Sequence, residues 1–241
     1  MPMRVAIVEN TAITHHGQIG VALHEAGARI RQFRPFAGEA LPALEDHDAL
    51  IVFGGEQSAR DDAAHPYLPA LAQQMRAFSE AGRATLGICL GAQILARGFG
   101  AENTLGTNPE FGWCAVAPTP AAAGDPLLGA LPAAFPIFQW HSDSFTLPPG
   151  ATHLARAQGA AQQAFRLGRA TWGTQFHFEA NRAVVADWTR TFPHLTEAMA
   201  PGWLAAHPAR AMAEGVEADR IGLQIARAFV GQIVPALTFA R

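Results

Sequence analysis

Apolar and polar residues alternate in blocks over the first hundred positions of the chain. Short apolar runs of strand length occur at residues 3–8, 28–33, 48–53 and 83–88, and helical spacing covers residues 19–26 and 67–81. Apolar runs that alternate with helices are typical of strands buried on both faces of a parallel sheet. We therefore predict an open, mostly parallel α/β sheet with helices on both faces.

Beyond residue 100 the apolar runs become shorter and no helix separates them. β-rich pieces cover residues 113–117, 135–138, 144–147, 152–155, 163–167 and 171–175. Tight turns at residues 148–150 and 168–169 connect some of these pieces. This pattern predicts antiparallel hairpins added to the sheet.

Helical spacing returns after Glu179, and the last long helix is expected over residues 217–233. Its apolar side chains recur every four residues, which makes one continuous stripe; they are Ile221, Ile225, Phe229, Ile233 and Leu237. We predict a domain over residues 1–190 and a helical extension over residues 191–241 that packs on the same domain. A subunit interface is the alternative use of the stripe, and a homo-oligomer is compatible with it.

The composition narrows the class of protein. With 241 residues, 49% hydrophobic and 15% charged, the chain is long and apolar enough for one large globular domain. Its net charge of -3 provides no electrostatic surface for nucleic acid, and its apolar segments are too short for a membrane span. Two cysteines do not make a disulfide framework, and residues 1–4 lead directly into a strand rather than into a signal peptide. We expect a cytoplasmic protein with a working thiol.

The candidate nucleophile is Cys89, which lies between Gly87 and Gly91 where a predicted strand meets a predicted helix. The pattern Gly-x-Cys-x-Gly is the thiol counterpart of the Gly-x-Ser-x-Gly nucleophile elbow. Glycine suits both flanking positions because a Cβ there would crowd the turn. The N-terminus of the following helix favours the thiolate form of the cysteine.

A base and an oxyanion hole can be assigned from two other stretches. His177 and Glu179 follow a predicted strand, so the carboxylate can hold one imidazole nitrogen while the other serves the thiol. The backbone amide of Leu90 and one from the Gly54–Gly55 turn are the expected oxyanion donors. The residues thus predict nucleophilic catalysis at a carbonyl carbon.

Five segments of the chain, in order, resemble the class I glutamine amidotransferases with a Cys-His-Glu triad. Within that family the chain is most similar to stand-alone proteins akin to the glutaminase domain of GMP synthase. The segments are Phe-Gly-Gly at residues 53–55, Gly-Ile-Cys-Leu-Gly-Ala-Gln at 87–93, Trp-His-Ser-Asp-Ser-Phe at 140–145, Gln-Ala-Phe-Arg at 163–166 and Gly-Thr-Gln-Phe-His-Phe-Glu at 173–179.

The resemblance implies a flavodoxin-like fold and an enzyme that needs no cofactor. It implies hydrolysis of the glutamine side-chain amide through a γ-glutamyl thioester on Cys89, which releases glutamate and ammonia. By the same resemblance, Gln93 and the Gly54–Gly55 backbone hold the bound glutamine, while the backbone around Ser142 and Asp143 grips its amino-acid end.

The chain departs from the family pattern at two positions. Many relatives have proline where Glu56 follows the two glycines, and many have glycine where Ser142 stands. The residues after position 190 are too few for a second catalytic domain. The ammonia acceptor is therefore expected to be a separate synthetase, if there is one.

Three functions remain open from the sequence. The first is a glutaminase that supplies a synthetase, and the second is a stand-alone hydrolase of a γ-glutamyl conjugate or another small amide, which the two departures favour. The third is a silent binding module, against which the intact triad argues. Cys114 is expected to be core filler, His141 to have a structural or substrate-backbone role, and the histidines lack the spacing of a metal site.

Overall fold

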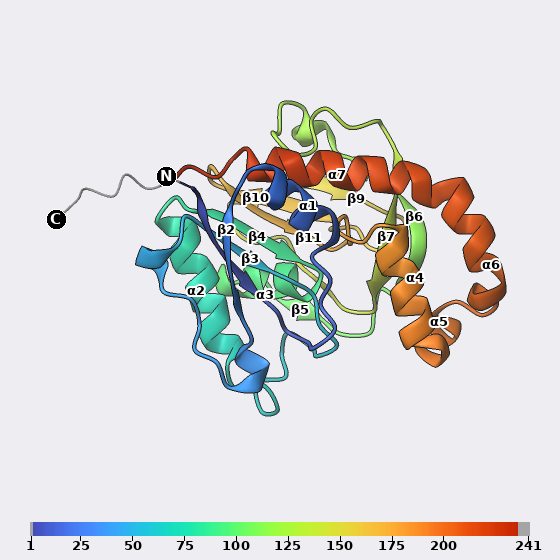
Figure 1. Ribbon diagram of the computed structural model, residues 1–241, viewed down its shortest axis with the longest axis horizontal. Helices are drawn as coiled ribbons and strands as arrows, with labels where there is room; N and C mark the ends of the chain where they lie inside the picture. The colour runs from blue at the N-terminus through green and yellow to red at the C-terminus, as the bar shows by residue number, and fades with distance from the viewer. Residues whose placement is uncertain (1, 236–241) are drawn as a thin grey trace.

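Nine strands form one sheet in the computed structural model, which describes residues 2–235 (Figure 1). Their order is β2-β1-β3-β4-β11-β10-β9-β6-β7. The strands on the parallel side are β2 (Arg29–Phe33), β1 (Arg4–Val8), β3 (Ala49–Val52), β4 (Ala84–Ile88) and β11 (Thr171–Thr174). The antiparallel side consists of β10 (Ala164–Leu167), β9 (Thr152–Arg156), β6 (Glu110–Pro118) and β7 (Phe135–His141). A second, two-stranded sheet joins β5 (Asn103–Thr104) to β8 (Ser144–Phe145).

The last strand corrects one part of the prediction. Antiparallel pairing holds for β6 with β7 and for β9 with β10, as expected, but β11 also pairs in parallel with β4. Thr171 lies opposite Thr85 and Thr174 lies opposite Ile88. All four residues of β11 are buried, since the strand lies in the middle of the sheet. This insertion brings the end of β11 beside the end of β4.

Helices cover both faces of the sheet, as the apolar strands predict. On one face, α1 (Gly17–Glu25) lies beside α7 (Val216–Val230), and their side chains share a core with Val5, Ile7 and Leu86. On the other face, α2 (Leu68–Glu80) and α3 (Leu90–Gly98) pack over alternate residues of the same strands, which include Ala6 and Val8. The alternation follows from the two-residue period of a strand. The architecture is a flavodoxin-like, mostly parallel sheet.

Four helices and a π-helical turn follow the last strand (Figure 1). They are α4 (Arg182–Thr191), α5 (Pro193–Met199), α6 (Trp203–Arg210), the π turn (Ala211–Gly215) and α7. Short 3-10 turns lie earlier in the chain, at Pro35–Ala37, Leu44–Asp46 and Pro120–Ala122.

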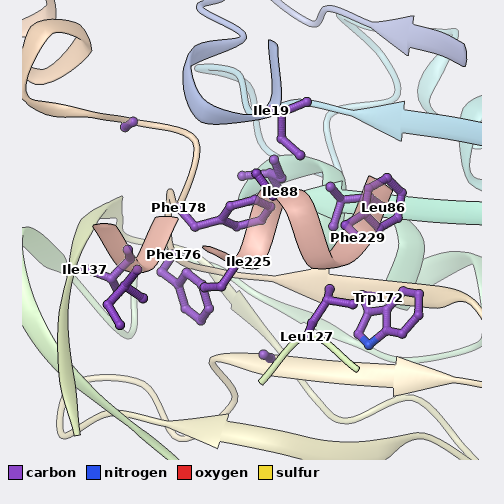
Figure 2. Packing of buried hydrophobic residues seen from close by; sticks show 14 of the residues in the cluster. Ile19, Leu86, Ile88, Leu127, Ile137, Trp172, Phe176, Phe178, Ile225 and Phe229 are labelled. Atoms are coloured by element: carbon purple, nitrogen blue, oxygen red, sulfur yellow. The ribbon is translucent and has the colours of Figure 1, made fainter. Parts of the chain in front are cut away.

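The stripe on α7 packs against the sheet of the same chain. Ile221, Ile225 and Phe229 are fully buried, and Figure 2 shows Ile225 and Phe229 among Trp172, Phe176 and Phe178. Ile233 is also buried, whereas Leu237 lies outside the described residues. A Cβ added at Gly222 would lie 2.2 Å from the carbonyl oxygen of Phe178, so α7 approaches the backbone of that segment closely. The helix therefore supports the chain segment around Phe178.

Two searches of residues 2–235 returned nothing. None of the helices there is long and apolar enough to cross a membrane. The same residues contain no group of three or more side chains placed to hold a metal ion.

Candidate active site

Cys89 occupies a strained turn between β4 and α3. Its φ is 53° and its ψ is −111°, and within residues 2–235 it is the only residue other than glycine with a positive φ. Such a conformation costs roughly 1–3 kcal/mol and persists only when the surroundings enforce it. The N–H of Cys89 donates to the carbonyl oxygen of Thr174 at 2.8 Å. The neighbouring strand β11 thus holds the turn.

The flanking glycines are required by close approach rather than by their own φ angles. A Cβ at Gly87 would lie 2.4 Å from the carbonyl oxygen of Gly91. A Cβ at Gly91 would lie 2.1 Å from the carbonyl oxygen of Val52 in β3. The first turn of α3 therefore rests directly on the backbone of the sheet, which points its free N–H groups toward the sulfur.

His177 and Glu179 lie in the short segment between β11 and α4. The N–H of His177 donates to the carbonyl oxygen of Phe138 in β7, which fixes the backbone. The Nδ1 atom of His177 lies 2.7 Å from Oε1 of Glu179. A second side-chain hydrogen bond joins the imidazole to Cys89. Since Glu179 occupies Nδ1, the thiol falls to Nε2.

The surroundings change the pKa of His177. Burial lowers this pKa, but the carboxylate of Glu179 and the sulfur of Cys89 raise it by more, so it lies well above its ordinary value. The imidazole is therefore charged at neutral pH when the thiolate and the carboxylate face it. A cation beside Cys89 favours the nucleophilic form of the sulfur.

Glu179 is held from two sides. Its carbonyl oxygen accepts from the N–H of Gln18 at the start of α1, at 2.9 Å. Only glycine fits at position 17, because a Cβ there would lie 1.9 Å from the same oxygen. The side chain is 1% exposed, and within the part of the chain that the structure describes its Oε2 has no hydrogen-bond partner. The carboxylate is thus fixed in place while one of its oxygens retains unused lone pairs.

Three of the predicted oxyanion and binding residues lie beside Cys89. A Cβ at Gly54 would lie 3.4 Å from Cβ of Cys89 and 3.2 Å from Cε1 of His177. A Cβ at Gly55 would lie 3.0 Å from a side-chain carbon of Leu90. Leu90 is the first residue of α3, so its N–H has no acceptor within the helix.

The other three predicted binding residues lie together, but they do not line the cavity above the thiol. Gln93 is 3% exposed, and its Nε2 donates to the carbonyl oxygen of Asp143 and to Oε1 of Gln175, at 3.2 Å each. The carboxylate of Asp143 accepts from the N–H of Gly106 at 2.7 Å. The hydroxyl of Ser142 lies 4.0 Å from the sulfur of Met199 in α5. Contact of these three residues with substrate stays a prediction.

Gln175 is a site residue that the sequence reasoning did not single out. Its Nε2 lies 3.7 Å from the sulfur of Cys89, and its Oε1 accepts from Gln93. The signal was available in the sequence, because residues two apart in an extended segment point to the same side. Gln175 and His177 are such a pair, and both reach Cys89.

A cavity of about 260 Å³ opens above Cys89 and His177. The loop after β1 forms one wall, with Thr11, Ile13, Thr14 and His15, and the turn after β3 forms another, with Phe53, Gly54, Gly55 and Glu56. The remaining wall consists of Trp140, Trp188, Phe192 and Leu195. His15 on the loop and Asp187 on α4 are joined at 2.8 Å, which ties two of the walls together.

Cys114 and His141 lie outside this cavity. Cys114 is in β6 and only half-buried, so it is less enclosed than the core role predicted. His141 is buried at the end of β7, with its Nε2 3.3 Å from the carboxylate of Glu110 and its Nδ1 3.1 Å from the carbonyl oxygen of Asp143. It braces the turn that carries Ser142 and Asp143.

Residues 16–184 match the family described as glutamine amidotransferase class-I, so the chain belongs to the class I glutamine amidotransferases. Membership supports hydrolysis of a glutamine amide as its general chemistry.

Particular relatives refine the placement. The chain is similar to the glutamine amidotransferase-like protein YfeJ of Salmonella typhimurium, at 33% identity over 181 residues that cover 73% of this chain and 76% of that protein. It is also similar to the GMP synthase (glutamine-hydrolyzing) of Aeropyrum pernix, at 33% identity over 159 residues. The match covers 63% of this chain but only 28% of that synthase. A solved glutamine amidotransferase from Thermotoga maritima has the same fold, with a TM-score of 0.85, 24% identity, and coverage of 97% and 99% of the two chains.

Proposed function

We propose that the protein hydrolyses the side-chain amide of glutamine with Cys89 as nucleophile, His177 as general base and acid, and Glu179 as the group that orients His177. The observation that carries the proposal is the chain of contacts from Glu179 through Nδ1 of His177 to the thiol, at a cysteine with a φ of 53°. This arrangement is that of an activated nucleophile whose base is itself held by a third group.

The reaction proceeds in two halves. The thiolate of Cys89 attacks the amide carbon, a C–S bond forms, and the C–N bond breaks as the imidazolium of His177 gives its proton to the leaving nitrogen. Water, deprotonated by His177, then attacks the γ-glutamyl thioester, and glutamate and the free thiol are released. The N–H of Leu90 and one from the Gly54–Gly55 turn would stabilise the oxyanion in both halves.

The binding assignments belong to the same proposal. Gln93, Ser142 and Asp143 form a braced layer next to Gln175, which itself reaches the sulfur. This layer would hold the amino-acid end of the substrate. A separate synthetase as acceptor of the ammonia is supported by the similarity to the GMP synthase of Aeropyrum pernix.

A second candidate is hydrolysis of a γ-glutamyl conjugate by the same residues. The apolar wall of the cavity favours it, because ammonia as leaving group has no apolar surface to bury.

Glutamate release from glutamine by the wild-type protein and by Cys89→Ala tests the proposal, with Cys114→Ala as the matched control. We expect Cys89→Ala to lose turnover by about 10⁴-fold or more, as the loss of a nucleophile does in other triads. Cys114→Ala should retain the wild-type rate. Turnover that persists in folded Cys89→Ala would falsify the assignment of the nucleophile.

A further inference from the structure

The cavity above Cys89 has an apolar wall that glutamine hydrolysis does not require. Six of its residues are apolar and come from four parts of the chain: Ile13, Phe53, Trp140, Trp188, Phe192 and Leu195. Leu195 is 53% exposed, so it marks the outer rim of the wall. The wall thus runs from the thiol to the solvent.

The wall begins at the imidazole of His177. The ring of Trp188 meets the ring of His177 edge-on, with 5.3 Å between centroids. Trp140 contacts Trp188 at 5.6 Å and Phe192 at 5.9 Å between centroids, both edge-on. Three aromatic side chains therefore form one continuous surface next to the proposed general acid.

The position of the general acid determines which part of a substrate meets this surface. In amide cleavage the imidazolium must lie next to the leaving nitrogen, since it delivers the proton there. Whatever that nitrogen carries lies on the same side, against Trp188 and Trp140. Ammonia as leaving group is about the size of one water molecule, whose share of liquid volume is about 30 Å³. It would leave most of a cavity of about 260 Å³ unfilled.

We propose that the preferred substrate is a γ-glutamyl amide whose nitrogen carries an apolar, aromatic or branched alkyl group. This rests on the proposed acyl transfer at Cys89. The C–N bond breaks as the C–S bond forms, the proton of His177 goes to the amine, and water then converts the thioester to glutamate. The amine leaves along the wall of Trp188, Phe192 and Leu195, which has apolar surface to match it.

The test compares kcat/KM for γ-glutamyl anilide, γ-glutamyl isobutylamide, γ-glutamylglycine and glutamine on the wild-type protein. The ratio kcat/KM reports the acylation half, in which the leaving group is still attached. We expect the two apolar amides to exceed glutamine and γ-glutamylglycine by about 10-fold or more, as expected for apolar groups that enter a matching pocket.

Variants of the wall locate the preference. Phe192→Ala and Leu195→Ala should each lower the ratio of the anilide value to the glutamine value by about 10-fold. Leu204→Ala is the matched control, since Leu204 is similarly exposed at 46% but lies on α6 outside the cavity lining. It should leave the ratio unchanged.

Two outcomes overturn the inference. One is a Cys89-dependent turnover of glutamine that equals or exceeds that of the apolar amides, which would leave the proposed glutaminase reaction intact. The other is an equal shift of the ratio in the Phe192, Leu195 and Leu204 variants. The proposed function itself fails in a different way, when none of the four amides is cleaved in a reaction that depends on Cys89.

Discussion

The two cysteines of this chain lie in opposite kinds of surroundings. Cys114 lies in the middle of β6, where burial and the carboxylate of Glu110 raise the pKa of its thiol to about 11. Cys89 is the more buried of the two, at 6% exposed, yet it ends a strand, begins a helix and is hydrogen-bonded to a charged imidazole. Burial alone therefore does not decide the chemistry of a thiol; the backbone position and the nearest cation do.

Removal of the cation should make the two thiols alike, and this is the largest effect we expect. His177→Ala takes away the proposed base and the positive charge beside Cys89, so kcat/KM should fall by about 10²–10⁴-fold. Glutamate release from glutamine measures the loss. His24→Ala, at an exposed histidine of α1, is the control and should match the wild type. A His177→Ala protein with most of its activity would mean that another group acts as base.

Alkylation by iodoacetamide at pH 7 compares the two thiols directly. With a pKa of about 11, only about one Cys114 thiol in 10⁴ is ionised at that pH. We expect Cys89 to react about 10²-fold faster or more, as followed by mass spectrometry of peptides that contain each cysteine. His177→Ala should reduce this difference. Equal rates in the wild-type protein would contradict the ion pair.

Glu179→Gln should have the smallest effect on turnover, because it removes the orienting charge but leaves the base. We expect kcat/KM to fall by about 10-fold, in the range typical of partners that orient a ligating or catalytic histidine. The pKa of His177 should drop toward its ordinary value, since the carboxylate is the largest of the influences that raise it. An NMR titration of the imidazole measures the change.

The same variant has a defined signature in stability against pH. A raised pKa of a histidine in the folded state stabilises the protein fully below the ordinary pKa of about 6.5 and ceases to do so as pH rises through the folded value. The free energy of unfolding lost in Glu179→Gln should therefore be largest near and below pH 6.5 and should shrink at higher pH. Urea unfolding at a series of pH values measures it, and a loss that grows with pH would contradict the assignment.

Local patterns in the sequence predicted the parts of the molecule that depend on neighbouring residues. The turn at Cys89 follows from two glycines that only a tight strand-to-helix junction requires. The pair of His177 and Glu179 follows from their spacing in one segment. The alternation of strands and helices likewise predicts a mostly parallel sheet.

Features that depend on distant contacts were not predicted. The position of β11 beside β4 is set by pairing between segments far apart in the chain, which periodicity does not encode. The burial of Gln93 depends on partners from the turn after β7 and from the end of β11. The aromatic wall joins Trp140 to Trp188, whose proximity follows only from the packing of α4 on the sheet.

The insertion of β11 beside β4 also bears on the order of events during synthesis. Thr174 supplies the carbonyl oxygen that holds the Cys89 turn, and it leaves the ribosome long after Cys89. A pairing across so much chain is slow to form because loop closure comes before any gain from the contact. Until it forms, Cys89 lacks both its enforced backbone conformation and its imidazole neighbour. A nascent or half-folded chain therefore carries an ordinary thiol, and the reactive one is created only by the completed fold.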